Sequence, residues 1–246
     1  MRPVIITGMG SSGTTHLWGV LSQDPKFNSC YCEPLHPNLP NEVEKDHYKA
    51  YTPELLGLHL PYFGEEDFVN DGLHNYISVL LSPGSLTKFI RLSKRMEWFC
   101  KKFPYVFIIV MVRDPRSVCV SLFEHANKEL TIEGAATTLA LWKHNMEVTF
   151  RALDKSLNPY TVVHYEDFCV FSEVCVDFIY RSLGRDIPIE VTTAYKEGFW
   201  GRFLKWQEPT NTNKVGAYEK LGDDFWKKAL LVSKLNLEKY GYGGVK

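Results

Sequence analysis

The chain has 246 residues, of which 45% are hydrophobic, 14% aromatic and 23% charged. This composition excludes a disordered, fibrous or collagen-like chain, and the length fits one large domain or one α/β domain with an inserted segment. Because 28 basic residues face 29 acidic ones, the formal net charge is −1. General electrostatic binding to nucleic acid or to an anionic membrane is therefore not expected.

Nothing in the sequence predicts a membrane anchor or a secretory leader. The most apolar run, residues 106–112, has the length of a strand, whereas a membrane-spanning helix needs about 20 apolar residues. Residues 2–8 pass directly into a glycine turn and leave no room for the apolar core of a signal peptide. The six cysteines form neither a CxxC pair nor a Cys/His zinc spacing, which favours reduced, mostly buried thiols. We therefore expect a cytoplasmic protein, although a chain trimmed of an upstream anchor would give the same reading.

Short apolar runs alternate with helical patterns along the chain, which predicts βα units around a parallel sheet. We expect strands at residues 4–7, 28–32, 105–112 and 160–164, and helices at residues 14–21, 86–102, 115–125, 131–153, 171–183 and 223–240. The predicted fold class is α/β, with a central parallel sheet flanked by helices.

Two stretches do not fit this alternation. Residues 34–84 are rich in Pro, Gly, His and aromatic residues, and residues 198–222 are irregular and polar. Long irregular segments in a compact domain are usually lids or binding loops, while an ordinary helical insertion with core aromatics is the alternative for residues 34–84. We expect a single domain over residues 1–246, with a substrate-side insertion at about 34–84 and a C-terminal loop at about 198–222.

The sharpest local feature is the glycine-rich run at residues 8–15, which reads Gly-Met-Gly-Ser-Ser-Gly-Thr-Thr between a strand and a helix. Glycines let the backbone turn tightly with its N–H groups inward, and the helix N-terminus adds partial positive charge, which together make a phosphate cradle. The spacing matches GxxxxGK[ST] except that Thr14 replaces the lysine. This change disfavours an ATPase or kinase; the alternative is a purely structural turn.

A second segment, residues 113–121, lies just past the strongest predicted strand, where open parallel sheets bind ligands. The guanidinium of Arg113 and the hydroxyl of Ser121 could together hold a second phosphate. The alternative is a structural ion pair between Arg113 and Asp114.

Together the two segments resemble the PAPS-dependent sulfotransferases, which transfer sulfate from 3′-phosphoadenosine 5′-phosphosulfate (PAPS). Residues 11–15 are similar to the family's [KR]-S-G-T-T loop, which holds the 5′-phosphosulfate, and residues 113–121 to its R-D-P-R-x-x-x-x-S segment, which binds the 3′-phosphate. Residues 32–36 and 88–91 are similar to the E-P and K-x-x-R segments of carbohydrate sulfotransferases, and residues 163–168 to a common Y-E-D-L strand end. The cofactor-binding residues that the resemblance implies are Gly10, Ser11, Ser12, Gly13, Thr14, Thr15, Arg113 and Ser121.

The resemblance implies a P-loop-like sulfotransferase fold and a sulfuryl transfer from PAPS to an acceptor hydroxyl. The products are then a sulfate ester and adenosine 3′,5′-bisphosphate, and no metal is needed. The acceptor is expected to be a carbohydrate or a small alcohol or phenol. Two rival functions are a P-loop nucleotide kinase or hydrolase, which would bind ATP with magnesium, and a nucleotide-binding pseudoenzyme.

One departure from the family pattern concerns the catalytic cation. The family usually carries Lys or Arg where this chain has Ser11. Either another cation replaces it, with Lys88, Arg91 and His16 as candidates, or the protein binds nucleotide and transfers slowly. For Lys88 and Arg91 the alternative is a solvated helix face.

The transfer also needs a group that takes the proton of the acceptor. Glu33 is the first candidate, because the strand before it should deliver it to the ligand-binding edge of the sheet, and His36 is the second. A loop carboxylate and an ordinary core histidine are the respective alternatives. Lys214 lies in a segment similar to the loop that cytosolic sulfotransferases close over the 3′-phosphate, and a surface lysine is its alternative.

Overall fold

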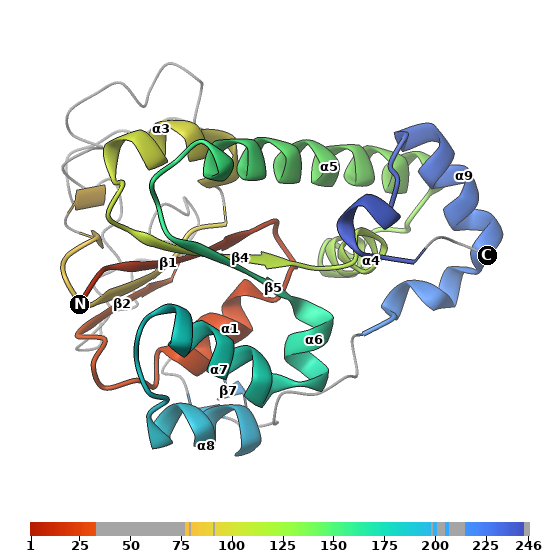
Figure 1. Ribbon diagram of the computed structural model, residues 1–246. Helices are drawn as coiled ribbons and strands as arrows, with labels where there is room; N and C mark the ends of the chain where they lie inside the picture. Colours follow the sequence, from red (N-terminus) through yellow and green to blue (C-terminus); the bar gives the residue numbers. More distant parts are fainter. Residues whose placement is uncertain are drawn as a thin grey trace.

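The computed structural model of the chain describes residues 1–32, 77–78, 80–90, 92–197, 199–200, 205–206 and 215–243. Its centre is a parallel five-stranded sheet in the order β2-β3-β1-β4-β5, with helices on both faces (Figure 1). The strands are β1 (Val4–Gly8), β2 (Ser29–Cys32), β3 (Ser85–Lys88), β4 (Phe107–Val112) and β5 (Tyr160–His164). The predicted α/β class is confirmed.

Most of the helices form two layers, one on each face of the sheet. One layer packs on one face of the sheet and includes η3 (Leu92–Arg95), α3 (Met96–Lys102), α4 (Pro115–His125), α5 (Ile132–Asp154) and α9 (Asp223–Ser233). The opposite layer consists of α1 (Thr14–Leu21), α6 (Tyr165–Val170), α7 (Ser172–Ser182) and α8 (Ile189–Glu197). The remaining described elements are β6 (Phe199–Trp200), β7 (Lys205–Trp206), η4 (Ala217–Leu221) and η5 (Glu238–Tyr240).

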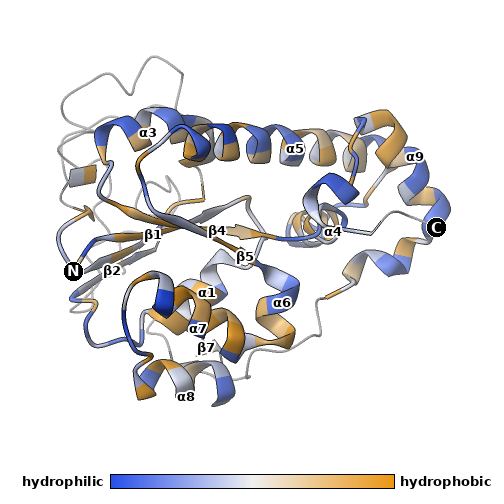
Figure 2. Cartoon of the chain, viewed as in Figure 1, coloured by the Kyte–Doolittle hydropathy of each residue, from blue (hydrophilic) through white to orange (hydrophobic). Residues whose placement is uncertain are grey.

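The core consists of two apolar clusters, one on each face of the sheet. Ile108, Val110 and Val112 of β4 point into the cluster with α5, while Ile109 and Met111 point into the cluster with α1. This division follows from the two-residue period of a strand, and it explains why a strand buried on both faces is continuously apolar. Figure 2 shows the helices around the sheet in bands of orange and blue, as amphipathic helices should be.

One predicted helix was wrong in a way that changes the sheet. Residues 86–102 were expected to be helical throughout, but residues 85–88 form β3 between β2 and β1. Leu86, Phe89 and Ile90 have helical spacing, yet Ser85, Leu86 and Thr87 are completely buried inside the sheet, where strand pairing outweighs local pattern. Helical structure begins only at Leu92. The sheet thus has five strands rather than the four predicted.

The last predicted helix was too long. It was expected over residues 223–240, but α9 ends at Ser233 because Lys234 adopts a left-handed conformation with φ 54°. A short 3₁₀ helix then covers residues 238–240. The helices α6 and α8 and the β6–β7 pair were not predicted. The other predicted elements are confirmed to within two residues at each end.

None of the described helices combines the length and the hydropathy that a bilayer crossing requires.

Candidate functional site

The glycine-rich loop lies at the carboxyl end of β1, at the centre of the sheet. Two of its glycines are required by close approaches: a Cβ at Gly8 would lie 2.4 Å from the Met111 carbonyl oxygen, and one at Gly13 would lie 2.2 Å from the Tyr165 ring. Gly13 also has φ +85°, and Ser11 adopts the left-handed region with φ 63°. The loop is therefore tightly packed between β4 and the start of α6.

The helix that follows the loop presents its N-terminus at this edge. Gly13 is the N-cap of α1 and supplies no side-chain cap, and the first turn of α1 carries no acidic residue. The first N–H groups of a helix have no intrahelical acceptors and favour a negative charge. The strand, loop and helix therefore have the arrangement that binds a phosphate group.

A lysine reaches this loop from one neighbouring strand. Lys88 ends β3, is only 3% exposed, and donates from Nζ to the Thr15 hydroxyl at 2.5 Å. Because β3 pairs with β1, the ammonium group is brought to the start of α1. The alternative for Lys88, a solvated helix face, is contradicted, since the residue lies on a buried strand rather than a helix.

An arginine reaches the loop from the other neighbouring strand. Arg113 follows β4, is 3% exposed, and donates from Nη1 to the Ser11 carbonyl oxygen at 2.8 Å. Its guanidinium also lies over the Tyr165 ring, 4.5 Å from the centroid. The two strands that flank β1 thus each bring one buried cation against the glycine loop.

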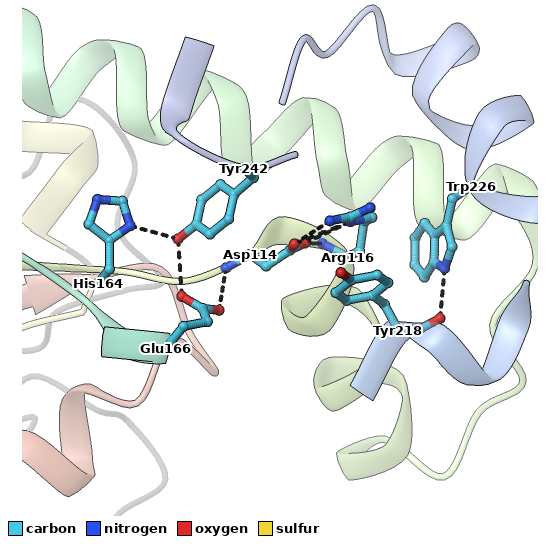
Figure 3. A network of polar contacts seen from close by, with 7 residues as sticks. All are labelled: Asp114, Arg116, His164, Glu166, Tyr218, Trp226 and Tyr242. Atoms are coloured by element: carbon cyan, nitrogen blue, oxygen red, sulfur yellow. Dashed lines mark hydrogen bonds and ion pairs between the residues drawn. The ribbon is translucent and has the colours of Figure 1, made fainter. Parts of the chain in front are cut away.

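The start of α4 is fixed by a buried ion pair. Asp114 is the N-cap of α4, where its carboxylate accepts the Arg116 N–H at 2.8 Å and binds the Arg116 guanidinium at 2.6 Å (Figure 3). Tyr218 packs against the other side of this guanidinium, 3.8 Å from its ring centroid. The described ion pair of this segment is therefore Asp114–Arg116, whereas the sequence suggested Arg113–Asp114 as an alternative. Ser121 lies further along α4 and is 9% exposed.

A polar group that sequence reasoning missed lies behind Asp114. The Glu166 carboxylate accepts the Asp114 N–H at 2.9 Å and the Tyr242 hydroxyl at 3.4 Å, and the Tyr242 oxygen lies 3.2 Å from His164 Nδ1. Burial raises the pKa of Glu166. The sequence contained one signal for Glu166: a carboxylate placed directly after a strand that ends at the ligand-binding edge.

The structure also corrects one candidate cation. His16 is buried in α1 and packs edge-on against Phe168, with ring centroids 5.2 Å apart. Burial lowers the pKa of His16 to about 4. This burial favours the neutral imidazole, which disfavours His16 as a replacement for the missing cation.

Four predicted site residues lie outside the described residues: Glu33, His36, Arg91 and Lys214. Their roles remain predictions. Within the described part of the chain, no cluster of three His, Cys, Asp or Glu side chains could hold a metal ion. Cys30, Cys100, Cys119, Cys169 and Cys175 are free thiols in the structure, and the side chain of Cys32 lies outside the described residues.

Comparisons with solved structures show which proteins share this fold. The sulfotransferase STF1 from Mycobacterium tuberculosis H37Rv has a TM-score of 0.55 and 16% identity, over 78% of this chain and 70% of that one. The sulfotransferase domain of the Synechococcus PCC 7002 olefin synthase has a TM-score of 0.56 and 16% identity, over 98% and 94%. Mouse sulfotransferase SULT7A1, solved in complex with PAP, has a TM-score of 0.56 and 12% identity, over 98% and 90%.

At these identities the structural likeness shows the fold alone. No curated protein matched the sequence. A family model described as "Sulfotransferase family" matches residues 3–188, which is more than half of the chain and includes β1, the glycine-rich loop, Lys88 and the Arg113–Ser121 segment. The chain therefore belongs to the sulfotransferase family.

Proposed function

We propose that this protein transfers a sulfuryl group from PAPS to an acceptor hydroxyl and releases adenosine 3′,5′-bisphosphate. The observation that carries the proposal is the convergence of two buried cations, Lys88 and Arg113, on the glycine loop from the two strands beside β1. Two cations at one loop suit a ligand with two phosphate groups. The PAP bound to mouse SULT7A1, which shares the fold, is a nucleotide of this class.

The residues of the loop fit a phosphate group. The Ser12 hydroxyl is buried and has no hydrogen-bond partner among the described residues, so it has a donor to give to a ligand. Residues 10–15 with Lys88 would hold the 5′-phosphosulfate end, and Arg113 with Ser121 the 3′-phosphate. When bound, PAPS supplies the activated sulfuryl group.

Lys88 is the residue that we assign to the place of the missing cation at Ser11. Its contact with the Thr15 hydroxyl sets the ammonium group beside the loop, where it would stabilise negative charge on the oxygen that leaves the sulfur. A preorganised donor at such an oxygen lowers the barrier by about 3 kcal/mol. The ammonium group places a positive charge beside the loop, which favours an anionic ligand there.

We assign the removal of the acceptor's proton to Glu33, with His36 as the second candidate. Cys32, the residue before Glu33, is the register partner of Lys88 in the β2–β3 pair. The chain therefore leaves β2 at the edge that carries the proposed cation. We propose a carbohydrate or a small alcohol or phenol as acceptor, and a single domain in which residues 34–84 form the substrate side and residues 198–222 a C-terminal loop.

Calorimetric titration tests the cofactor class directly. The protein is titrated with adenosine 3′,5′-bisphosphate, with ADP, and with ATP plus magnesium. We expect the 3′,5′-bisphosphate to bind at least about tenfold more tightly than ADP, which corresponds to about 1.4 kcal/mol for the 3′-phosphate. Preference for magnesium–ATP would overturn the proposal in favour of a kinase or hydrolase, and binding of none of the three would leave the loop a structural turn.

A further inference from the structure

Tyr242 belongs to the C-terminal part of the described chain, yet it packs against the middle of the molecule. Its ring makes edge-on contacts with Trp142 of α5, at 6.5 Å between centroids, and with His164 at the end of β5, at 5.6 Å. The residue is 9% exposed, and its N–H donates to the Leu237 carbonyl oxygen at 3.1 Å. Ring and backbone contacts therefore fix the position of the phenol.

The Tyr242 hydroxyl lies between a carboxylate and an imidazole (Figure 3). Its oxygen is 3.4 Å from Glu166 Oε2 and 3.2 Å from His164 Nδ1. A phenol has one proton to donate, and the carboxylate can only accept it. The hydroxyl therefore donates to Glu166, and the phenol oxygen accepts from His164 when Nδ1 carries the proton.

Glu166 also forms a hydrogen bond with the segment that begins with Arg113. Its second oxygen accepts the Asp114 N–H at 2.9 Å. That N–H belongs to the planar peptide unit that joins Arg113 to Asp114, so the hydrogen bond fixes the peptide plane next to the Arg113 Cα. From there the Arg113 side chain reaches the Ser11 carbonyl oxygen at 2.8 Å.

These contacts form one continuous chain across four segments of the molecule. It runs from Tyr242 through the Glu166 carboxylate and the Asp114 amide to Arg113, and ends at the glycine loop. Glu166 is half-buried, so the hydrogen bonds it accepts are partly shielded from competition with water.

We propose that Glu166 and Tyr242 are positioning residues that orient Arg113 for the 3′-phosphate of the bound nucleotide. The C-terminal segment, which follows the sheet by more than 70 residues, would thereby contribute to recognition of the nucleotide without touching it. This inference rests on the proposed function, because Arg113 is assigned there to the 3′-phosphate.

The test compares affinity for adenosine 3′,5′-bisphosphate with affinity for adenosine 5′-monophosphate, because only the first carries a 3′-phosphate. Tyr242→Phe removes the hydroxyl alone and keeps the ring contacts. We expect it to weaken binding of the bisphosphate by about threefold to tenfold, the value of one or two hydrogen bonds, and to leave monophosphate binding within about twofold.

Two changes at Glu166 separate positioning from packing. Glu166→Ala removes the acceptor of the Asp114 N–H and should reduce the preference for the bisphosphate at least as much as Tyr242→Phe. Glu166→Gln should restore most of that preference, because its amide oxygen can still accept the N–H. Tyr160→Phe is the matched control: it removes a hydroxyl that contacts the Asp154 carboxylate at 3.3 Å at the opposite end of β5, and should change neither affinity.

The outcomes distinguish this inference from the proposed function. A wild-type protein that binds both nucleotides equally would overturn the proposed function and the positioning role with it. A wild-type preference that survives unchanged in Tyr242→Phe and Glu166→Ala would overturn the positioning role alone. Equal weakening of both nucleotides in these variants would also overturn it, since a purely structural defect does not single out the 3′-phosphate.

Discussion

Each end of the sheet holds a buried ion pair between an aspartate and an arginine. At the amino ends of the strands Asp24 pairs with Arg185, and at the carboxyl ends Asp114 pairs with Arg116. Both aspartate side chains are at most 5% exposed, and the arginines 11% and 6%. Burial and pairing are thus alike, although only the second pair lies at the candidate site.

The surroundings of Asp24 make a closed cluster. Besides Arg185, its carboxylate accepts the Tyr180 hydroxyl at 2.8 Å and the Lys26 N–H at 2.8 Å. One acid and one base balance each other, and the carboxylate has three donors. Such a cluster joins α1, α7 and the segment before β2, and we expect its role to be structural.

The surroundings of Asp114 connect the ion pair to the glycine loop. The Asp114 N–H donates to Glu166, the preceding Arg113 donates to the Ser11 carbonyl oxygen, and Lys88 reaches the same loop from β3. The comparison teaches that a buried ion pair does not by itself identify a site; contact between neighbouring buried cations and the glycine loop is what distinguishes the second pair.

A cavity also lies at the other end of the molecule. A pocket of about 570 Å³ lies beside Arg185, lined by Arg2, Lys26, Phe107 and residues 181–185. It contains no residue of the glycine loop. We place the function at the glycine loop because two buried cations, a helix N-terminus and a buried hydroxyl meet there.

The largest effect on either ion pair is expected for Asp24→Ala. This change leaves the Arg185 guanidinium buried without its carboxylate, and we expect a loss of about 3–5 kcal/mol in the free energy of unfolding. Urea denaturation measures it. Glu97→Ala is the control: its pair with Lys101 is about 70% exposed and should cost less than about 1 kcal/mol. A loss as small as the control's would show that the Asp24 cluster is not structural.

At the other end, Lys88→Ala should lower turnover rather than stability. We expect kcat to fall by about 10²–10³-fold, because the variant loses the proposed stabilisation of the leaving oxygen. Steady-state assay of sulfate-ester formation with a saturating donor measures it. Lys101→Ala, which changes an exposed lysine of α3, serves as the control. Unchanged turnover in Lys88→Ala would contradict the assignment of Lys88 and favour Arg91 as the catalytic cation.

The smallest of the three effects is expected for Arg113→Ala. The variant should bind adenosine 3′,5′-bisphosphate about 10–100-fold more weakly, as expected for the loss of charge-assisted hydrogen bonds. Calorimetry against the wild type measures the difference. Arg181→Ala removes an exposed arginine paired with Asp177 and is the control. Equal affinities of Arg113→Ala and wild type would contradict the assignment of the 3′-phosphate.

The sequence was informative where local pattern and structure coincide. Continuous apolar runs predicted β1 and β4, and Pro115 marked the start of α4. β3 was missed because its four residues merge with Phe89 and Ile90 into a helical spacing, and only pairing with β1 and β2 reveals the strand. Long-range partners outweigh local pattern in such short segments.

The candidate site shows the same division. The glycine loop and Arg113 were predicted from contiguous motifs, and the structure brings them into contact. Contacts between distant segments could not be predicted: the Phe168 ring that helps to bury His16, and the Tyr242 hydroxyl that meets Glu166 from 76 residues away. Burial and partner choice of this kind are properties of the folded chain.

The contact between Gly13 and Tyr165 has a consequence for how this protein can evolve. A single methyl group at residue 13 would press into the Tyr165 ring, on which the Arg113 guanidinium lies. One aromatic ring thus forms a common wall between the glycine loop and Arg113. A smaller side chain at residue 165 is therefore a necessary condition for any side chain at residue 13, which would still carry the strain of φ +85°.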